Sequence, residues 1–218
     1  MTETIEDYLR VIYHLQENNQ TATTTALARE LRVSPPTVTA MLKKLSASKL
    51  VLYQPYQPVE LTSAGKQAAL RIIRFHRLAE TFLVQVLGVS WESVHAEAHK
   101  WEHVMTDDIA ARLERLLGYP HHDPHGDPIP TADGILPHEQ VLLSLAAVKA
   151  GQRVAVARIL DESPALLEYL GSLGLYPGSE VFVVATAPFD GPITLRLGER
   201  EEIIGLNAAT QVLVNMLG

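Results

Sequence analysis

Three histidines and a glutamate are spaced as metal ligands on one helix would be. They are His95, His99, Glu102 and His103. At about 100° per residue these positions fall at about 0°, 40°, −20° and 80° around the axis of a helix over residues 91–117. Their side chains would therefore share one narrow face. Imidazole and carboxylate groups gathered in this way hold divalent metal ions in helical bundles.

Three residues elsewhere in the chain could complete such a site. His76 and Glu80 are four positions apart, which places them one turn apart on a helix predicted for residues 62–87. Asp7 adds a carboxylate from the first predicted helix, residues 4–17. A polar helix face with ion pairs and hydrogen-bonded histidines would contain similar residues. The number of potential ligands on one helix face nevertheless favours a metal site.

The order of the ligands permits a second chemistry. His99, Glu102 and His103 match H-x-x-E-H, in which the glutamate of a zinc peptidase is a general base and not a ligand. This match leaves His76 and His95 without a role, so a zinc hydrolase is the alternative. Three further histidines lie in a proline-rich stretch; they could bind metal weakly, but we expect solvated side chains there. They are His121, His122 and His125.

Residues 34–49 have the composition of a DNA-recognition helix. Ser34 is a good N-cap, and Pro35 suits the first helical position. One side repeats apolar residues at helical spacing. The other side offers short side chains that let the backbone approach base edges, and lysines that neutralise phosphates. The candidate DNA contacts are Ser34, Pro36, Thr37, Thr39, Ala40, Lys43 and Lys44.

A predicted hairpin at residues 50–61 follows this helix, and the order of elements is that of a winged helix-turn-helix. Residues 1–74 contain nine Lys and Arg against six Asp and Glu, a net charge of +3 in a chain of net charge −7. A basic N-terminal third on an acidic body indicates a separate binding module. A small helical bundle with a solvated basic face is the other interpretation.

Composition excludes several classes of protein. Of the 218 residues, 47% are hydrophobic and 20% charged, which is ordinary for a globular chain. The absence of cysteine excludes disulfides, thiolate zinc sites and cysteine nucleophiles. No apolar run reaches the roughly 18 residues that span a bilayer, and the acidic N-terminus does not resemble a signal peptide. We therefore expect a cytoplasmic protein that binds no membrane.

The remaining patterns predict a mostly α-helical chain with a C-terminal β unit. Five prolines in residues 119–138 indicate a linker. Glycines then punctuate short strands, as in small all-β domains. We expect a DNA-binding domain, a helical metal-binding domain that includes the linker, and a β domain. Their boundaries are residues 1–74, 75–140 and 141–218.

Several motifs are distributed over essentially the whole chain. The longest is V-H-A-E-A-H-K-W-E-H-V-M at 94–105. The others are E-D-Y-L-R-V-I-Y-H-L at 6–15, S-P-P-T-V-T at 34–39, L-T-S-A-G-K at 61–66, H-R-L-A-E at 76–80 and G-D-P-I-P at 126–130. With these motifs the chain resembles the diphtheria-toxin-repressor/manganese-regulator family of metal-dependent transcriptional repressors.

The resemblance implies a homodimer that binds a double-stranded DNA operator in response to a divalent metal. Its parts would be a winged helix, a helical metal-binding and dimerisation domain, and a small β-barrel like the ferrous-transport protein FeoA. The implied primary site is Asp7, His99, Glu102 and His103. The implied ancillary site is His76, Glu80 and His95, with C-terminal ligands expected near Asp161, Glu162 and Ser163.

Departures from the family pattern bear on the metal. Iron-sensing members carry sulphur where this chain has Asp7 and His99, whereas manganese-sensing members are acidic at the positions of Asp7, Arg10 and His99. Oxygen ligands suit Mn²⁺, and imidazole also suits Fe²⁺ and Zn²⁺. We expect a repressor of manganese or iron homeostasis genes that is activated by Mn²⁺, with Fe²⁺ as the alternative and no small organic ligand.

Two further expectations concern the modules. A metal-trafficking protein whose winged helix binds protein is a third hypothesis, which indifference to duplex DNA would favour. Because few contacts should cross a proline-rich linker, removal of residues 141–218 is expected to leave a folded dimer that still responds to metal.

Overall fold

The computed structural model describes residues 2–137 and 141–217. The chain divides into two compact units, which are described separately. The first contains the chain up to His76 with residues 99–112 and 130–136, and the second contains 77–98, 113–129 and 137 onward. The boundary falls inside helix α4 (Ser63–Gln85). No helix in the described ranges combines the length and hydropathy that crossing a membrane requires.

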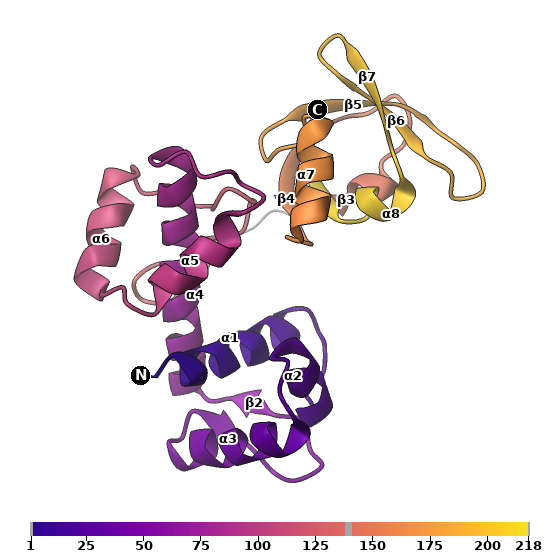
Figure 1. Ribbon diagram of the computed structural model, residues 1–218. Coiled ribbons are helices and arrows are strands. Elements are labelled where there is room, and N and C mark those ends of the chain that lie inside the picture. The colour runs from indigo at the N-terminus through magenta and orange to yellow at the C-terminus, as the bar shows by residue number, and fades with distance from the viewer. Residues whose placement is uncertain (1, 138–140, 218) are drawn as a thin grey trace. The chain divides into compact units, whose positions relative to one another are not determined.

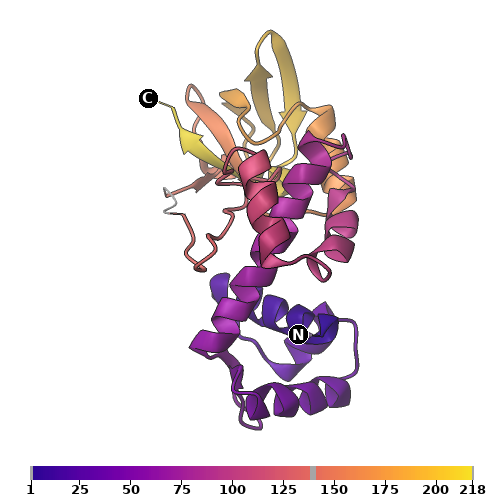
Figure 2. The same cartoon turned by 90° about the vertical axis from the view of Figure 1, so that its left-hand side faces the viewer.

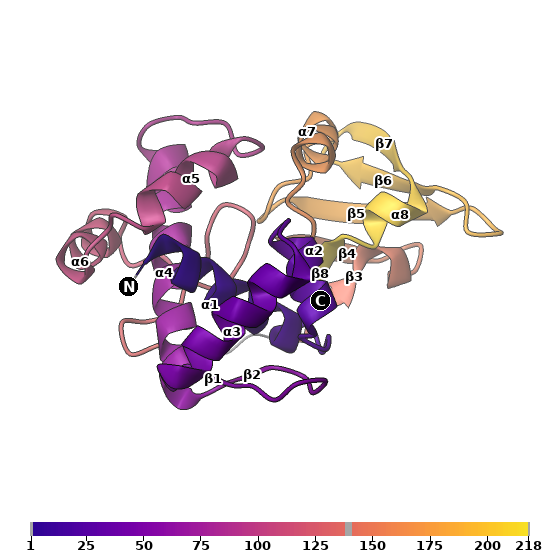
Figure 3. The same cartoon turned by 60° about the horizontal axis from the view of Figure 1, so that its bottom comes forward.

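The N-terminal part of the first unit is a winged helix-turn-helix (Figure 1). Ser34 caps the third helix by accepting a hydrogen bond from the Thr37 backbone N–H at 3.4 Å. The paired strands lie beside that helix in Figure 3. The elements are α1 (Glu3–Glu17), α2 (Thr24–Glu30), α3 (Pro35–Ala47), β1 (Val51–Leu52) and β2 (Glu60–Leu61). Their core fully buries Leu9, Ile12, Leu27, Val38, Leu42 and Leu45.

Residues 91–117 form two helices where the sequence predicted one. Helix α5 (Val94–Glu102) ends before His103, and α6 (Asp107–Leu116) begins after a turn. The Thr106 hydroxyl accepts a hydrogen bond from the Ile109 backbone N–H at 3.4 Å, and two aspartates follow Thr106, as at a helix start. The single-helix prediction was wrong, so the turn and not the helical repeat sets the direction of His103. Helix α4, with 23 residues, precedes both and is seen along its length in Figure 2.

The C-terminal part of the second unit is an antiparallel sheet of six strands in the order β3-β8-β4-β5-β6-β7. The strands are β3 (Leu143–Ser144), β4 (Arg153–Ile159), β5 (Glu180–Thr186), β6 (Ile193–Leu197), β7 (Arg200–Ile204) and β8 (Val212–Met216). The helices are η1 (Leu145–Ala147), α7 (Pro164–Ser172) and α8 (Leu206–Ala209). Among the described residues β7 and β3 do not pair. The pairings therefore show a β unit but not the closed barrel that the resemblance implied.

The proline-rich stretch is folded and does not form the predicted linker. Asp123 Oδ1 accepts hydrogen bonds from the backbone N–H groups of His125, at 2.8 Å, and Asp127, at 3.0 Å. Both acids are buried, and His125 has no exposed surface, so the prediction that it is solvated was wrong. Proline restricts local backbone geometry, but proline content does not indicate whether a segment packs against the rest of the protein. His121 and His122 are exposed, as expected, and position 138 lies outside the described residues.

Candidate metal centres and nucleic-acid interface

The first cluster of candidate ligands joins α1 to the end of α5. Asp7 lies on α1, His99 and Glu102 lie on α5, and His103 lies in the turn that follows. One ligand atom of each residue lies within 4.8 Å of the others. Asp7 Oδ1 is 3.5 Å from His103 Nε2 and 3.9 Å from His99 Nε2. The structure thus brings together the four residues expected for a primary site, all within the first unit.

Two buried atoms show that the first cluster suits a metal ion. Asp7 Oδ1 and His103 Nε2 have no hydrogen-bond partner among the described residues. His103 Nδ1 is 2.8 Å from Glu6 Oε2, to which it can donate. That hydrogen bond leaves Nε2 as the nitrogen available to a metal, in the way that outer carboxylates orient metal-binding histidines. The sequence did not identify Glu6, whose only signal was its place in the first turn of α1.

Glu102 is at the centre of the first cluster, and its side chain is fully buried. Its Oε2 shares a short hydrogen bond with His76 Nδ1, and its Oε1 is 2.9 Å from His99 Nδ1 and 3.3 Å from His103 Nε2. Burial by itself would raise the pKa of Glu102. The hydrogen bond from His76, its charge and then that of Arg10 outweigh burial and lower the pKa. Glu102 is therefore a carboxylate at neutral pH.

The second cluster surrounds Glu80 in the second unit. Glu80, Asp123 and His125, all buried, each place a ligand atom within 4.8 Å of the others. Glu80 Oε1 is also 3.3 Å from His95 Nδ1, which is 3.1 Å from Glu162 Oε2. The second cluster thus contains two of the expected ancillary residues and one of the three expected C-terminal residues. His76, one turn before Glu80 on α4, is described with the first unit, where it contacts Glu102.

His125 has one ring nitrogen that can bind a metal. Its Nε2 donates a hydrogen bond to the Trp91 carbonyl oxygen at 2.9 Å. Its Nδ1 is buried, has no hydrogen-bond partner among the described residues, and lies 3.8 Å from Glu80 Oε2. Burial lowers the pKa of His125, but the neighbouring carboxylates, Glu80 first, raise it to about 9. An ion bound here must therefore displace a proton, so its affinity falls as the pH decreases.

His95 and Glu162 form a charged pair at the exposed side of the second cluster. The hydrogen bond to Glu162, followed by that to Glu80, raises the pKa of His95 to about 9. Burial would raise the pKa of Glu162, but the hydrogen bond from His95 lowers it to about 2. At neutral pH the metal-free pair is therefore ionised, and metal binding to His95 would release a second proton.

Two arginines hold the segment that carries Asp123 and His125. Asp127 Oδ1 is 3.0 Å from Arg77 Nη2, on α4, and 2.5 Å from Arg158 Nη2, on β4. Arg77 Nε is also 3.6 Å from Asp123 Oδ2. The segment is therefore ionically bonded to a helix on one side and to the β sheet on the other.

Close backbone packing adds to these ion pairs. The Ile159 N–H donates to the His125 carbonyl oxygen at 2.9 Å. Gly126 has φ of +89°, and a Cβ there would lie 2.0 Å from the Ala157 oxygen, so only glycine fits. Asp123 was not predicted as a ligand, and His125 was expected to be solvated, because this segment was assigned to a linker. The available signal was H-H-D-P-H-G-D at 121–127, in which possible ligands flank a glycine.

The exposed side of α3 carries the candidate DNA contacts. Thr39 is half-buried, and its hydroxyl donates to the Pro35 carbonyl oxygen at 3.1 Å. The hydroxyls of Ser34 and Thr37 are 2.8 Å apart and share a hydrogen bond in the cap. Six of the seven candidates are exposed, namely Ser34, Pro36, Thr37, Ala40, Lys43 and Lys44. The two lysines provide cations for phosphate contacts.

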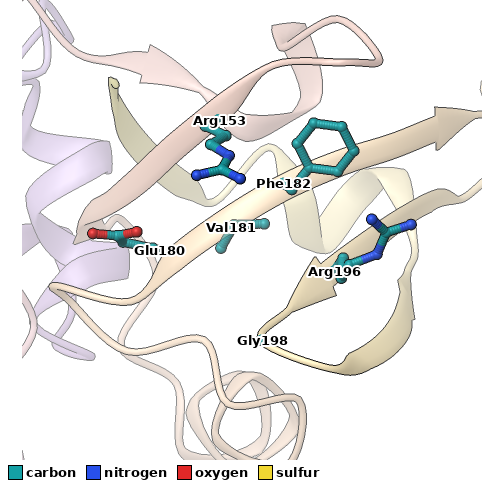
Figure 4. Close-up of a pocket in the computed structure, with 6 residues that line it drawn as sticks. All are labelled: Arg153, Glu180, Val181, Phe182, Arg196 and Gly198. Atoms are coloured by element: carbon teal, nitrogen blue, oxygen red, sulfur yellow. The ribbon is translucent and has the colours of Figure 1, made fainter. Parts of the chain in front are cut away.

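A pocket of about 290 Å³ on the β unit shares no residue with either cluster (Figure 4). Arg196 lies over the Phe182 ring, 5.4 Å from its centre, and pairs with Glu201 at 2.9 Å. The lining residues are Arg153, Glu180, Val181, Phe182, Arg196 and Gly198. Glu180 alone among them could bind a metal, so we assign the pocket no metal site.

Comparisons with known proteins cover each part of the chain. The N-terminal DNA-binding domain of iron-dependent repressors matches residues 1–59. Their metal-binding and dimerisation domain matches residues 62–131, and the FeoA domain matches 143–216.

Individual relatives include both iron and manganese regulators. The iron-dependent repressor IdeR of Mycobacterium bovis is 36% identical over 214 residues, which cover 93% of this chain and 92% of the relative. The diphtheria toxin repressor of Corynebacterium diphtheriae is 30% identical, covering 94% of this chain and 85% of the relative. A solved manganese-dependent transcriptional repressor in complex with manganese is 39% identical, with a TM-score of 0.86, covering 98% of this chain and all of that one.

A winged helix, a helical region with two ligand clusters and a FeoA-like β unit define the class of metal-dependent transcriptional repressors. The chain belongs to the iron-dependent repressor family, which includes the diphtheria toxin repressor. The resemblance found in the sequence and the predicted fold class are thereby confirmed.

Proposed function

We propose that the protein is a metal-dependent repressor that binds an operator in double-stranded DNA as a homodimer in the cytoplasm. The first cluster carries the proposal. Asp7, in the winged helix, faces His99, Glu102 and His103, and two buried atoms of this group lack hydrogen-bond partners among the described residues. A bound divalent ion would supply the positive charge that such a donor set attracts.

The residues of the first cluster can link metal binding to DNA binding. Asp7 and Glu102 repel one another across the contact between α1 and α5, and a bound divalent ion would relieve this repulsion. A divalent ion held by both carboxylates would keep α1 against α5 through Asp7, and α3 belongs to the same winged helix as α1. A metal ion that binds one conformation of the protein more tightly than the other would increase the population of that conformation. In a homodimer, two α3 helices can then contact successive major grooves.

We propose Mn²⁺ as the activating ion, with Fe²⁺ as the alternative. The first cluster offers two carboxylates and two imidazoles, and the chain contains no cysteine. Oxygen-rich sites suit Mn²⁺. The structural relative above is manganese-dependent, whereas the relatives found by sequence are iron-dependent or diphtheria toxin repressors, so the family contains both specificities.

We propose the second cluster as an ancillary metal site. Glu80 and His95 keep the role that the resemblance implied. His76 also stays a proposed ligand, because its hydrogen bond to Glu102 uses only Nδ1. The contacts add Asp123, His125 and Glu162 as further candidate ligands.

The zinc-hydrolase alternative receives no support from the geometry of Glu102. A general base must reach a water molecule and a substrate. Glu102 is 1% exposed and hydrogen-bonded to His76 and His99. We therefore propose that the protein is not an enzyme.

DNA binding is expected to require a divalent metal. Fluorescence anisotropy with an operator-containing duplex, measured at matched free Mn²⁺, Fe²⁺, Zn²⁺ and Co²⁺ under anaerobic conditions, tests this. We expect tight binding with Mn²⁺ and loss of binding with excess chelator. Equal affinity with and without chelator would contradict the sensor function. Indifference to duplex DNA under all conditions would favour the metal-trafficking hypothesis.

Lys43 and Lys44 are expected to contact phosphates. Each Lys→Ala variant should weaken binding to all duplex sequences similarly and lower the slope of log affinity against log salt by about 1. Arg29, an exposed arginine on α2 that pairs with Glu30, provides a control as Arg29→Ala. A salt slope unchanged in both lysine variants would show that this side of α3 does not lie at the phosphates.

A further inference from the structure

A guanidinium group stands inside the first cluster, among atoms expected to bind a cation. Arg10 Nη2 is 3.6 Å from Asp7 Oδ1, and Arg10 Nη1 is 3.6 Å from Glu102 Oε1. The Arg10 side chain is 15% exposed, so water screens these charges little. Both distances exceed the usual length of a hydrogen bond, so the attraction is mainly between charges.

The same two oxygen atoms are the ones that face His99 and His103. Asp7 Oδ1 is 3.5 Å from His103 Nε2, and Glu102 Oε1 is 3.3 Å from that nitrogen. A metal ion held by His103 Nε2 and these oxygens would therefore bind the atoms that Arg10 attracts. Two positive charges that share the carboxylates of Asp7 and Glu102 repel one another, and in a poorly screened site this repulsion is large.

We propose that Arg10 is a built-in counter-cation that competes with the divalent metal for Asp7 and Glu102. Its charge offsets the repulsion between the two carboxylates in the metal-free protein and lowers the affinity of the first cluster for metal. Arg10 thereby sets the metal concentration at which the repressor responds. This inference rests on the proposed function and adds a residue that tunes it.

The decisive variant is Arg10→Gln, which keeps a polar side chain and removes the charge. Isothermal titration with Mn²⁺ measures metal affinity directly, and the binding step lost in Asp7→Asn identifies the first cluster. We expect Arg10→Gln to tighten that step by about tenfold or more, because a full charge is removed from a poorly screened site. The Mn²⁺ midpoint for DNA binding should fall by a similar factor.

Two matched variants separate charge from packing. Arg10→Lys keeps the charge and should stay within about threefold of the original affinity. Arg112→Gln, which breaks an exposed pair between Arg112 and Asp108 on α6, should leave the Mn²⁺ affinity unchanged. Unchanged or weakened binding in Arg10→Gln would overturn the inference and show that Arg10 only supports the ligands.

A nuclear magnetic resonance measurement on the unmodified chain tests the inference without depending on whether a variant folds. The ¹⁵Nε–Hε signal of Arg10 should shift as diamagnetic Zn²⁺ is added, over the same range in which the His103 ring signals shift. A stationary Arg10 signal over that range would overturn the inference. Absence of any metal-dependent shift at His103 would contradict the proposed function itself, so the two failures can be distinguished.

Discussion

Replacing Glu102 with glutamine is expected to remove the metal response of DNA binding. Both oxygens of Glu102 are in use, one toward His76 and the other toward His99 and His103. Glutamine has nearly the same shape but no charge, and one of its two terminal atoms is a donor. Mutating a residue that only hydrogen-bonds to a metal ligand typically lowers metal affinity by about 10- to 100-fold. For a ligand at the centre of the cluster we expect at least about 100-fold weaker Mn²⁺ activation.

The measurement is DNA-binding anisotropy against free Mn²⁺, combined with thermal unfolding to confirm that the variant is folded. Glu97→Gln makes the same chemical change at an exposed position of α5 and is the matched control. A Glu102→Gln protein that keeps the Mn²⁺ midpoint of the original chain would exclude Glu102 as a ligand. One that keeps metal but loses a peptidase activity would support the hydrolase alternative.

Removal of residues 141–218 is expected to disrupt the second unit, contrary to the expectation from sequence. Trp91 packs in the core of the β unit, 4.8 Å between ring centres from Tyr176. Replacing a buried tryptophan with alanine costs about 3–5 kcal/mol of stability, and we expect a loss of similar size when the deletion exposes Trp91. The deletion also removes Glu162 and Arg158, one of the two arginines that pair with Asp127.

We expect the truncated chain to lose metal binding at the second cluster and to unfold at a lower temperature. Counting Mn²⁺ per chain after equilibrium dialysis, together with thermal unfolding, tests both effects. In the full-length chain, Glu162→Gln removes one ligand without exposing the core and should weaken the second site with little loss of stability. A truncated chain with the original stability and full metal content would restore the linker hypothesis.

The sequence by itself determined the features that depend on local spacing. Helical repeat and capping residues predicted α3 together with its buried and exposed sides, since Ser34, Pro35 and the apolar positions act within a few residues. The spacing of His99 and Glu102 placed both on one face of α5. The family motifs joined Asp7 to that face, although 92 positions separate Asp7 from His99.

Tertiary structure alone decided which groups meet across the fold. His76 contacts Glu102, Glu6 orients His103, and Arg10 faces two carboxylates. None of these contacts follows from a periodic pattern, because each joins helices whose packing depends on the whole core. The turn at 103–106 could have been predicted from the sequence. Thr106 and the two aspartates after it are typical of a helix N-terminus, but the continuous apolar spacing favoured a single helix.

The proline-rich segment shows most clearly the difference between what local sequence predicts and what tertiary contacts decide. Composition marks residues 119–137 as irregular, and the backbone there is indeed neither helix nor extended strand. Whether an irregular segment is solvated or buried depends on partners distant in sequence. Here Arg77 and Arg158 neutralise Asp127, and β4 pairs with the backbone of His125. Burial of polar groups becomes favourable only when such partners satisfy them, and their positions exist only in the folded chain.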